Sequence, residues 1–187
     1  MDIVLCSKKS IKIFGDKGIY PIETVFGVFS ITATLSKPKF MKTLLELATI
    51  PKSPKFIYHK IKKKSLMTDP TMKQWNQLIP YKCIFGFTGT INGQWVLELN
   101  NKIKNNSIDR HLLPDIIIVN KVGMIEKIHE RINEPYDENL SYYHFTDFSK
   151  YKNPGSCFPR ILNHLHMATT WENVVMPDYV EYFKKDL

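Results

Sequence analysis

The sequence predicts an α/β protein with a mixed central sheet flanked by helices. Apolar runs of strand length recur along the 187 residues, segments with helical spacing lie between them, and no repeat or low-complexity linker divides the chain. Helices that alternate with apolar strands pack on a sheet and cover it on both sides. We therefore expect a single domain over residues 1–187, with its core at about 1–130 and a C-terminal helical part at about 150–187.

The N-terminal part is predicted to form strands followed by a helix. Residues 2–6 are a short apolar run, residues 11–14 alternate, and residues 24–35 are rich in β-branched and aromatic side chains. The last of these should be a central strand that is buried on both faces along much of its length. Ser36, a good N-cap, precedes a predicted helix over 37–49.

The remainder of the chain continues to alternate. Strands are recognised by their apolar runs, helices by apolar residues at helical spacing, and a loop by the polar stretch 133–139. The predicted elements are a short helix at 71–78, strands at 81–87, 115–119 and 124–125, a helix at 94–101, and tail helices at 156–169 and 177–185.

Composition excludes several classes of protein. No apolar run approaches the roughly 18 residues needed to cross a bilayer, and the N-terminus lacks the features of a signal peptide, so we expect a cytoplasmic protein without membrane contact. The three cysteines form no CxxC pair, which argues against a disulfide framework or a cysteine zinc site. A net charge of +8 favours anionic partners, nucleic acid first, although lysine-rich codon bias gives the same signature.

An acidic residue at the start of one strand, followed by a longer strand and a helix, resembles the PD-(D/E)XK nuclease superfamily. There an aspartate and a later acid–x–lysine triplet lie on paired strands, so that two carboxylates hold Mg²⁺ and the lysine assists the attacking water. The stretch 21–35 is similar to the motif P-x-E-S-V-Y-A-V-I-E-V-K-S-x-L of an uncharacterised bacterial branch of this superfamily. The resemblance implies a restriction-endonuclease-like core with Asp2 as the first motif residue.

Two positions depart from that motif. Ser30 stands where the superfamily has its acid, and Thr32 stands where it has its lysine. The resemblance therefore implies a degenerate active site and, because Asp2 comes so early, a shortened N-terminus. Asp2 alone is a weak ligand for Mg²⁺, which relies on clustered carboxylates. Glu23 lies an odd seven residues before Ser30 and would point to the opposite sheet face unless a bulge intervenes, so we interpret it as a brace at the strand entry.

Asp115 follows Pro114 and offers a second motif start. No acid–x–lysine triplet follows it within reach, because Glu126 and Glu130 are each followed directly by a basic residue. We therefore interpret Asp115 as a residue that opens a strand.

A lysine-rich stretch between Pro51 and Asp69 is the remaining functional feature. Lysines contact phosphates without reading sequence, and Tyr58 could stack on the bases of a single strand. The alternative interpretation is a solvated segment whose lysines reflect composition. The candidate nucleic-acid-binding residues are Lys52, Lys55, Tyr58, Lys60, Lys62, Lys63 and Lys64.

Three functions remain open. The first is a non-catalytic, nuclease-like protein that binds nucleic acid, in a bacterial or phage defence context. The second is an immunity or accessory protein that binds a protein partner or a second copy of itself through an exposed sheet edge. The third is a Mg²⁺-dependent nuclease that uses Asp2, Glu23 and an unorthodox third ligand. For the first two functions no cofactor is expected.

Overall fold

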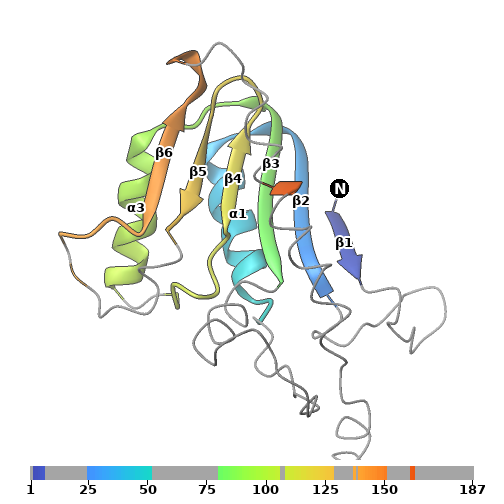
Figure 1. Ribbon diagram of the computed structural model, residues 1–187, viewed down its shortest axis with the longest axis horizontal. Helices are drawn as coiled ribbons and strands as arrows, with labels where there is room; N and C mark the ends of the chain where they lie inside the picture. Colours follow the sequence, from blue (N-terminus) through green and yellow to red (C-terminus); the bar gives the residue numbers. More distant parts are fainter. Residues whose placement is uncertain are drawn as a thin grey trace, which may run out of the picture.

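A computed structural model of the chain describes residues 2–6, 25–51, 80–105, 108–128, 137, 139–150 and 161–162. These residues form a six-stranded mixed sheet in which spatial order follows sequence order (Figure 1). The central pairs β2–β3 and β3–β4 are parallel, and the other three pairs are antiparallel. The strands are β1 (Asp2–Cys6), β2 (Val25–Leu35), β3 (Tyr81–Gly89), β4 (Ile116–Val119), β5 (Gly123–Lys127) and β6 (Tyr143–Asp147).

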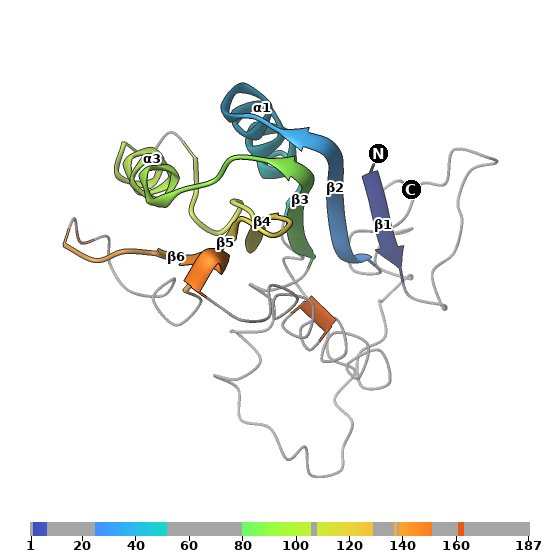
Figure 2. The ribbon, with the colours of Figure 1, turned by 90° about the horizontal axis from the view of Figure 1, so that it is seen from above.

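Two α-helices, α1 (Lys37–Ala48) and α3 (Gly93–Lys104), lie on one face of this sheet, which we call the helix face (Figure 2). The rings of Phe40 and Trp95 stack between the helices with their centroids 4.4 Å apart. The main apolar core lies between the helices and the sheet.

On the opposite face, a second apolar cluster includes Phe148, from the short 3-10 helix η3 (Phe148–Lys150), and Ile161. The sheet thus has apolar packing on both faces, as an α/β fold requires. Both described α-helices nevertheless share one face, which the sequence pattern did not reveal.

The secondary structure predicted for the described residues is confirmed with small shifts at the ends. The predicted strands at 81–87 and 124–125 are each longer in the structure, and the helix predicted at 94–101 extends to Lys104. Strand β6 was not predicted, because three of its five residues, His144, Thr146 and Asp147, are polar and leave no clear alternation of apolar and polar side chains. The elements predicted at 11–14, 71–78 and 177–185, and most of 156–169, lie outside the described residues.

The prediction that residues 24–35 are buried on both faces holds for only part of β2. Residues 25–28 are buried, but Phe29, Ser30 and Ile31 are half-buried, and Ala33 and Thr34 are exposed. Thr32 and Leu35 are buried, so the C-terminal half of β2 is accessible only in part.

The end of β3 is fitted closely to β2. Gly89 has a φ of 135°, and a Cβ at this residue would lie 2.1 Å from the carbonyl oxygen of Leu35. Glycine is the residue that adopts this conformation without strain. Gly89 thus lets the chain leave β3 against β2 and turn toward α3.

Among the residues that the structure describes, no helix is both long and apolar enough to span a bilayer.

Candidate functional site

The register of the sheet aligns one row of side chains across all six strands on the helix face. The central members of this row are apolar and buried in the main core, whereas its β1 end is polar. From β1 to β6 the row consists of Asp2, Ser30, Ile84, Ile117, Ile125 and Phe145.

Asp2 and Ser30 form the polar end of the row and touch each other. The Ser30 hydroxyl donates a hydrogen bond of 2.8 Å to Oδ1 of Asp2. Residues directly opposite each other in an antiparallel pair have their Cβ atoms about 4.5–5.5 Å apart, which is close enough for such a bond. The sheet therefore brings together Asp2 and Ser30, which lie 28 positions apart in the chain and which the resemblance assigned to the first and second motif positions.

Thr32 lies two residues beyond Ser30 and on the same face of β2. It is 9% exposed, and its hydroxyl donates to the carbonyl oxygen of Thr34 at 3.1 Å. On β3 its neighbour is Gly86, which leaves this side of Thr32 without a facing side chain. The position that would hold a lysine amine in the superfamily thus holds a hydroxyl engaged with its own strand.

These residues do not fit a magnesium site. Mg²⁺ requires hard oxygen ligands, chiefly carboxylates. At this site Asp2 supplies one carboxylate, and Ser30 and Thr32 supply neutral hydroxyls. Across the part of the chain that the structure describes, no group of three or more histidine, cysteine, aspartate or glutamate side chains could hold a metal ion. Among the described residues, the donor set of the site therefore contains a single carboxylate.

The other predicted site residues cannot be placed. Glu23 and the whole lysine-rich stretch, with Tyr58, lie outside the described residues, and their roles stay predictions. The described chain stops at Pro51, just before that stretch, and resumes at Pro80.

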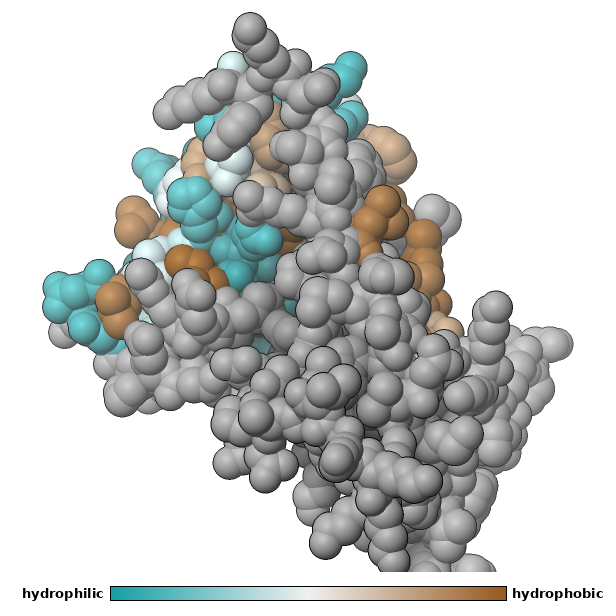
Figure 3. All heavy atoms as spheres, viewed as in Figure 1, coloured by the Kyte–Doolittle hydropathy of each residue, from teal (hydrophilic) through white to brown (hydrophobic). Residues whose placement is uncertain are grey.

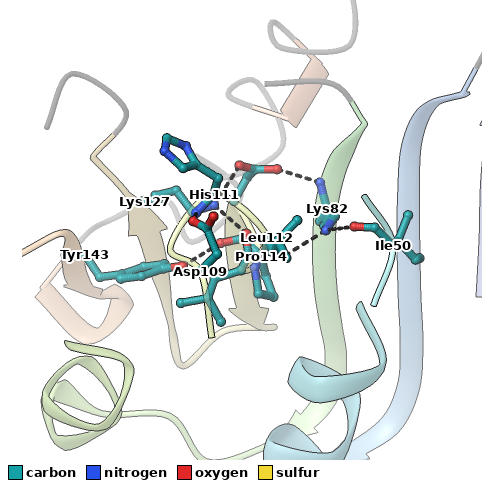
Figure 4. Close-up of polar contacts among 10 residues, drawn as sticks. Ile50, Lys82, Asp109, His111, Leu112, Pro114, Lys127 and Tyr143 are labelled. Atoms are coloured by element: carbon teal, nitrogen blue, oxygen red, sulfur yellow. Dashed lines mark hydrogen bonds and ion pairs between the residues drawn. The ribbon is translucent and has the colours of Figure 1, made fainter. Parts of the chain in front are cut away.

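A second polar cluster, which the sequence analysis missed, lies buried on the helix face (Figure 4). Lys82, Asp115 and Lys127 are 0%, 1% and 3% exposed. Asp115 Oδ2 accepts a 2.7 Å hydrogen bond from the backbone N–H of Lys82, and Oδ1 lies 3.3 Å from the Lys127 ammonium. Lys82 comes from β3, Asp115 from just before β4 and Lys127 from β5, so Asp115 ties three neighbouring strands together.

The two buried ammonium groups also hold backbone carbonyls. Lys82 Nζ donates to Ile50, just beyond α1, and to Leu112 at 2.7 Å, while Lys127 Nζ donates to Leu113. Carbonyl oxygens satisfy a buried ammonium that would otherwise be costly to remove from water. The cluster therefore fixes the loop before β4 and the chain just after α1.

Tyr143 completes the cluster from β6. Its hydroxyl donates a 2.9 Å hydrogen bond to the carbonyl oxygen of Pro114. Burial, together with the nearby negative charge of Asp115, raises the pKa of Tyr143 well above its ordinary value of 10.0. The phenol therefore stays protonated in the folded protein under alkaline conditions that ionise an exposed tyrosine.

This raised pKa predicts how stability depends on pH. Above about pH 10 the unfolded state loses the Tyr143 proton while the folded state retains it, so the free energy of unfolding should fall as pH rises. Urea unfolding at a series of pH values, compared between the wild type and Tyr143→Phe, measures this contribution. The Phe variant should be less stable at neutral pH and should show a shallower alkaline loss. Equal slopes in the two proteins would contradict the prediction.

A signal for this cluster was present in the sequence. Lys82 lies between Tyr81 and Cys83 in an apolar run, and the alternation of a strand places it on the same face as Ile84, which is buried. A lysine at a core-facing position requires buried acceptors. The sequence does not say which distant residues supply them.

A mixed sheet with a β1–β2 antiparallel pair, the helix α1 after it and the parallel strand β3 next defines an α/β fold. The fold class expected from the sequence is thus confirmed. No protein-family model matches the chain, and no curated protein matches it.

Solved structures of NucC have a similar fold. The cAAA-bound form of NucC from P. aeruginosa ATCC27853 matches with a TM-score of 0.60 and 16% identity, over 97% of this chain and 68% of that one. NucC from E. coli MS115-1 matches in its apo form with a TM-score of 0.56 and 16% identity, over 98% and 74% of the two chains. The cAAA-bound form of the same E. coli protein matches with a TM-score of 0.55 and 17% identity, over 98% of this chain and 69% of that one. At such identities the likeness is one of fold.

Proposed function

We propose that this protein has a nuclease-like fold and binds nucleic acid without cleaving it, as part of a bacterial or phage defence system. The observation that carries this proposal is the Ser30–Asp2 hydrogen bond. It supports a site in which a hydroxyl occupies the place of the second carboxylate, so that Mg²⁺ lacks the ligands it needs. Without that ion, neither the attacking water nor the leaving oxygen is activated in the way such nucleases require.

Binding to nucleic acid is supported by charge. The chain carries an excess of eight positive charges, and six lysines fall within the 13 residues from Lys52 to Lys64. Lysines that neutralise phosphates release counterions, which drives association at low salt. Among the similar folds, two of the NucC structures hold cAAA, a cyclic oligonucleotide, which supports a nucleotide-type ligand for this fold.

Fluorescence anisotropy of labelled duplex and single-stranded DNA and RNA tests the proposal. With Mg²⁺ present, we expect binding at low salt that weakens steeply at moderate salt, and no cleavage in the same samples. Changing Lys60, Lys62, Lys63 and Lys64 to Gln should reduce affinity strongly. The matched control changes four exposed lysines elsewhere, Lys39, Lys42, Lys104 and Lys121, and should reduce it much less.

Each of the other outcomes would point to a different function for this chain. Absence of binding at low salt would eliminate the nucleic-acid proposal. Equal losses in the two lysine variants would assign the affinity to net charge alone. Cleavage that depends on Mg²⁺ and disappears in Asp2→Ala would establish an active nuclease with Asp2 in its site, and loss of cleavage in Glu23→Gln would extend that site to Glu23.

An immunity or accessory protein that binds another protein is the second candidate. It is favoured by one observation, the exposed apolar side chains of the edge strand β1. Capture of a specific protein by a mechanism insensitive to salt would support it. A single-domain organisation and a cytoplasmic location remain proposals that accompany both candidates.

A further inference from the structure

The two edges of the described sheet differ in how they are protected. At one edge, β6 carries His144 and Asp147, and α3 packs against it. Charged side chains and a covering helix are devices by which proteins prevent an edge strand from pairing with another chain. At the other edge, β1 has four exposed residues out of five, and Asp2 at its start is its one charged residue.

Strand β1 exposes apolar side chains on both faces of the sheet. Ile3 is 38% exposed, Val4 50% and Leu5 36%. Hydrophobic side chains gather at the edge of the molecule where Figure 1 places β1 (Figure 3). Within the described residues, β2 is the strand that pairs with β1, and the outer side of β1 has no partner strand. An edge of this kind is a template for strand addition.

We propose that the outer edge of β1 pairs with β1 of a second copy of this chain, antiparallel and centred on Val4. In this register Val4 faces Val4 of the second copy, and Ile3 faces its Leu5. Asp2 then faces Cys6, so the two carboxylates are kept apart instead of opposing each other. All central cross-strand pairs are apolar, which is the arrangement that stabilises a strand pair. The self-complementary sequence of β1 is the reason to assign a second copy as the partner.

The symmetry of this pairing determines where the candidate sites lie. Opposite residues of antiparallel strands share a face of the sheet, so a twofold axis through Val4 runs perpendicular to the sheet. The sheet would continue through both copies, with α1 and α3 of each on the same side. The two Asp2–Ser30 pairs would then lie on one surface, on either side of the axis. This inference does not depend on nucleic-acid binding.

The strength of the dimer is limited by its area. One pair of five-residue strands buries much less than the roughly 1,200 Å² of a standard protein interface. We therefore expect a reversible dimer with a dissociation constant in the micromolar range or weaker. Sedimentation velocity across protein concentrations should show a monomer–dimer equilibrium.

Val4→Lys tests the register directly. It places two ammonium groups opposite each other on the twofold axis, and like charges so placed destabilise a strand pair, so the dissociation constant should rise about tenfold or more. The substitution is at a half-exposed side chain, and circular dichroism verifies that the variant folds. Leu97→Lys, which makes the same change at a 62% exposed residue of α3, is the matched control and should leave the equilibrium unchanged.

Cysteine cross-linking provides a second test that does not rely on weakening the dimer. Under mild oxidation, Val4→Cys should form a disulfide-linked dimer, because the two residues on the axis face each other. Ile3→Cys should not, because its counterpart lies two positions away. A wild-type protein that stays monomeric at all concentrations, equal dimerisation in Val4→Lys, or equal cross-linking at both positions would overturn the proposal.

Discussion

Replacing Asp115 with asparagine should lower the free energy of unfolding by about 3–5 kcal/mol, because it removes one partner of a buried ion pair. Asparagine retains an acceptor for the backbone N–H of Lys82 but loses the charge that faces the Lys127 ammonium at 3.3 Å. Both side chains of this pair are at most 1% exposed, so water cannot replace the lost carboxylate. The buried ammonium is then left with a much less favourable environment.

Urea denaturation followed by circular dichroism measures this loss. Asp109→Asn is the matched control, since Asp109 is exposed and lies in the loop before β4. It accepts a hydrogen bond of 2.8 Å from the N–H of His111, and its substitution should change stability only slightly. Adding Lys127→Met to Asp115→Asn should recover part of the loss by removing the unbalanced charge. Similar losses in the two single variants would contradict the assigned role of Asp115.

The second large effect is expected at the candidate site, where Ser30→Glu should create a binding site for divalent metal. The new carboxylate would lie directly opposite Asp2 on the antiparallel β1–β2 pair. Two facing carboxylates repel each other without metal and hold a hard cation together, so affinity for Mn²⁺ should rise about tenfold or more over the wild type. Metal should also raise the melting temperature of the variant, because the ligand stabilises the folded state.

Thr34→Glu is the control for this gain. Thr34 lies on the same strand and the same face as Ser30, is exposed, and is four residues further from the Asp2 position. It introduces the same charge without a facing carboxylate. Isothermal titration with Mn²⁺ should detect the gain in Ser30→Glu and little change in Thr34→Glu. Equal affinities in the two variants would show that Asp2 does not contribute to a metal site.

Much of the sheet could be predicted from local patterns. Apolar runs such as residues 115–119 form strands because both of their faces are buried, and the helical spacing of Phe40, Leu44 and Leu47 predicted the buried side of α1. Strand β6 escaped prediction because an edge strand with one polar face carries a weak pattern. The same limitation applies to the exposed Ala33 and Thr34 of β2, since burial depends on what packs above a strand and not on its own residues.

The sequence by itself determined which residue types occupy the candidate site. A serine and a threonine at positions 30 and 32 are neutral in any fold, and under the resemblance to the PD-(D/E)XK motif they stand where that motif has an acid and a lysine. Only the tertiary structure decided that Asp2 lies beside Ser30, that Asp115 faces Lys127, and that β1 is an edge. Each of these depends on strand register and strand order, which arise from contacts between residues far apart in the chain. Local propensity and periodicity carry no information about such contacts.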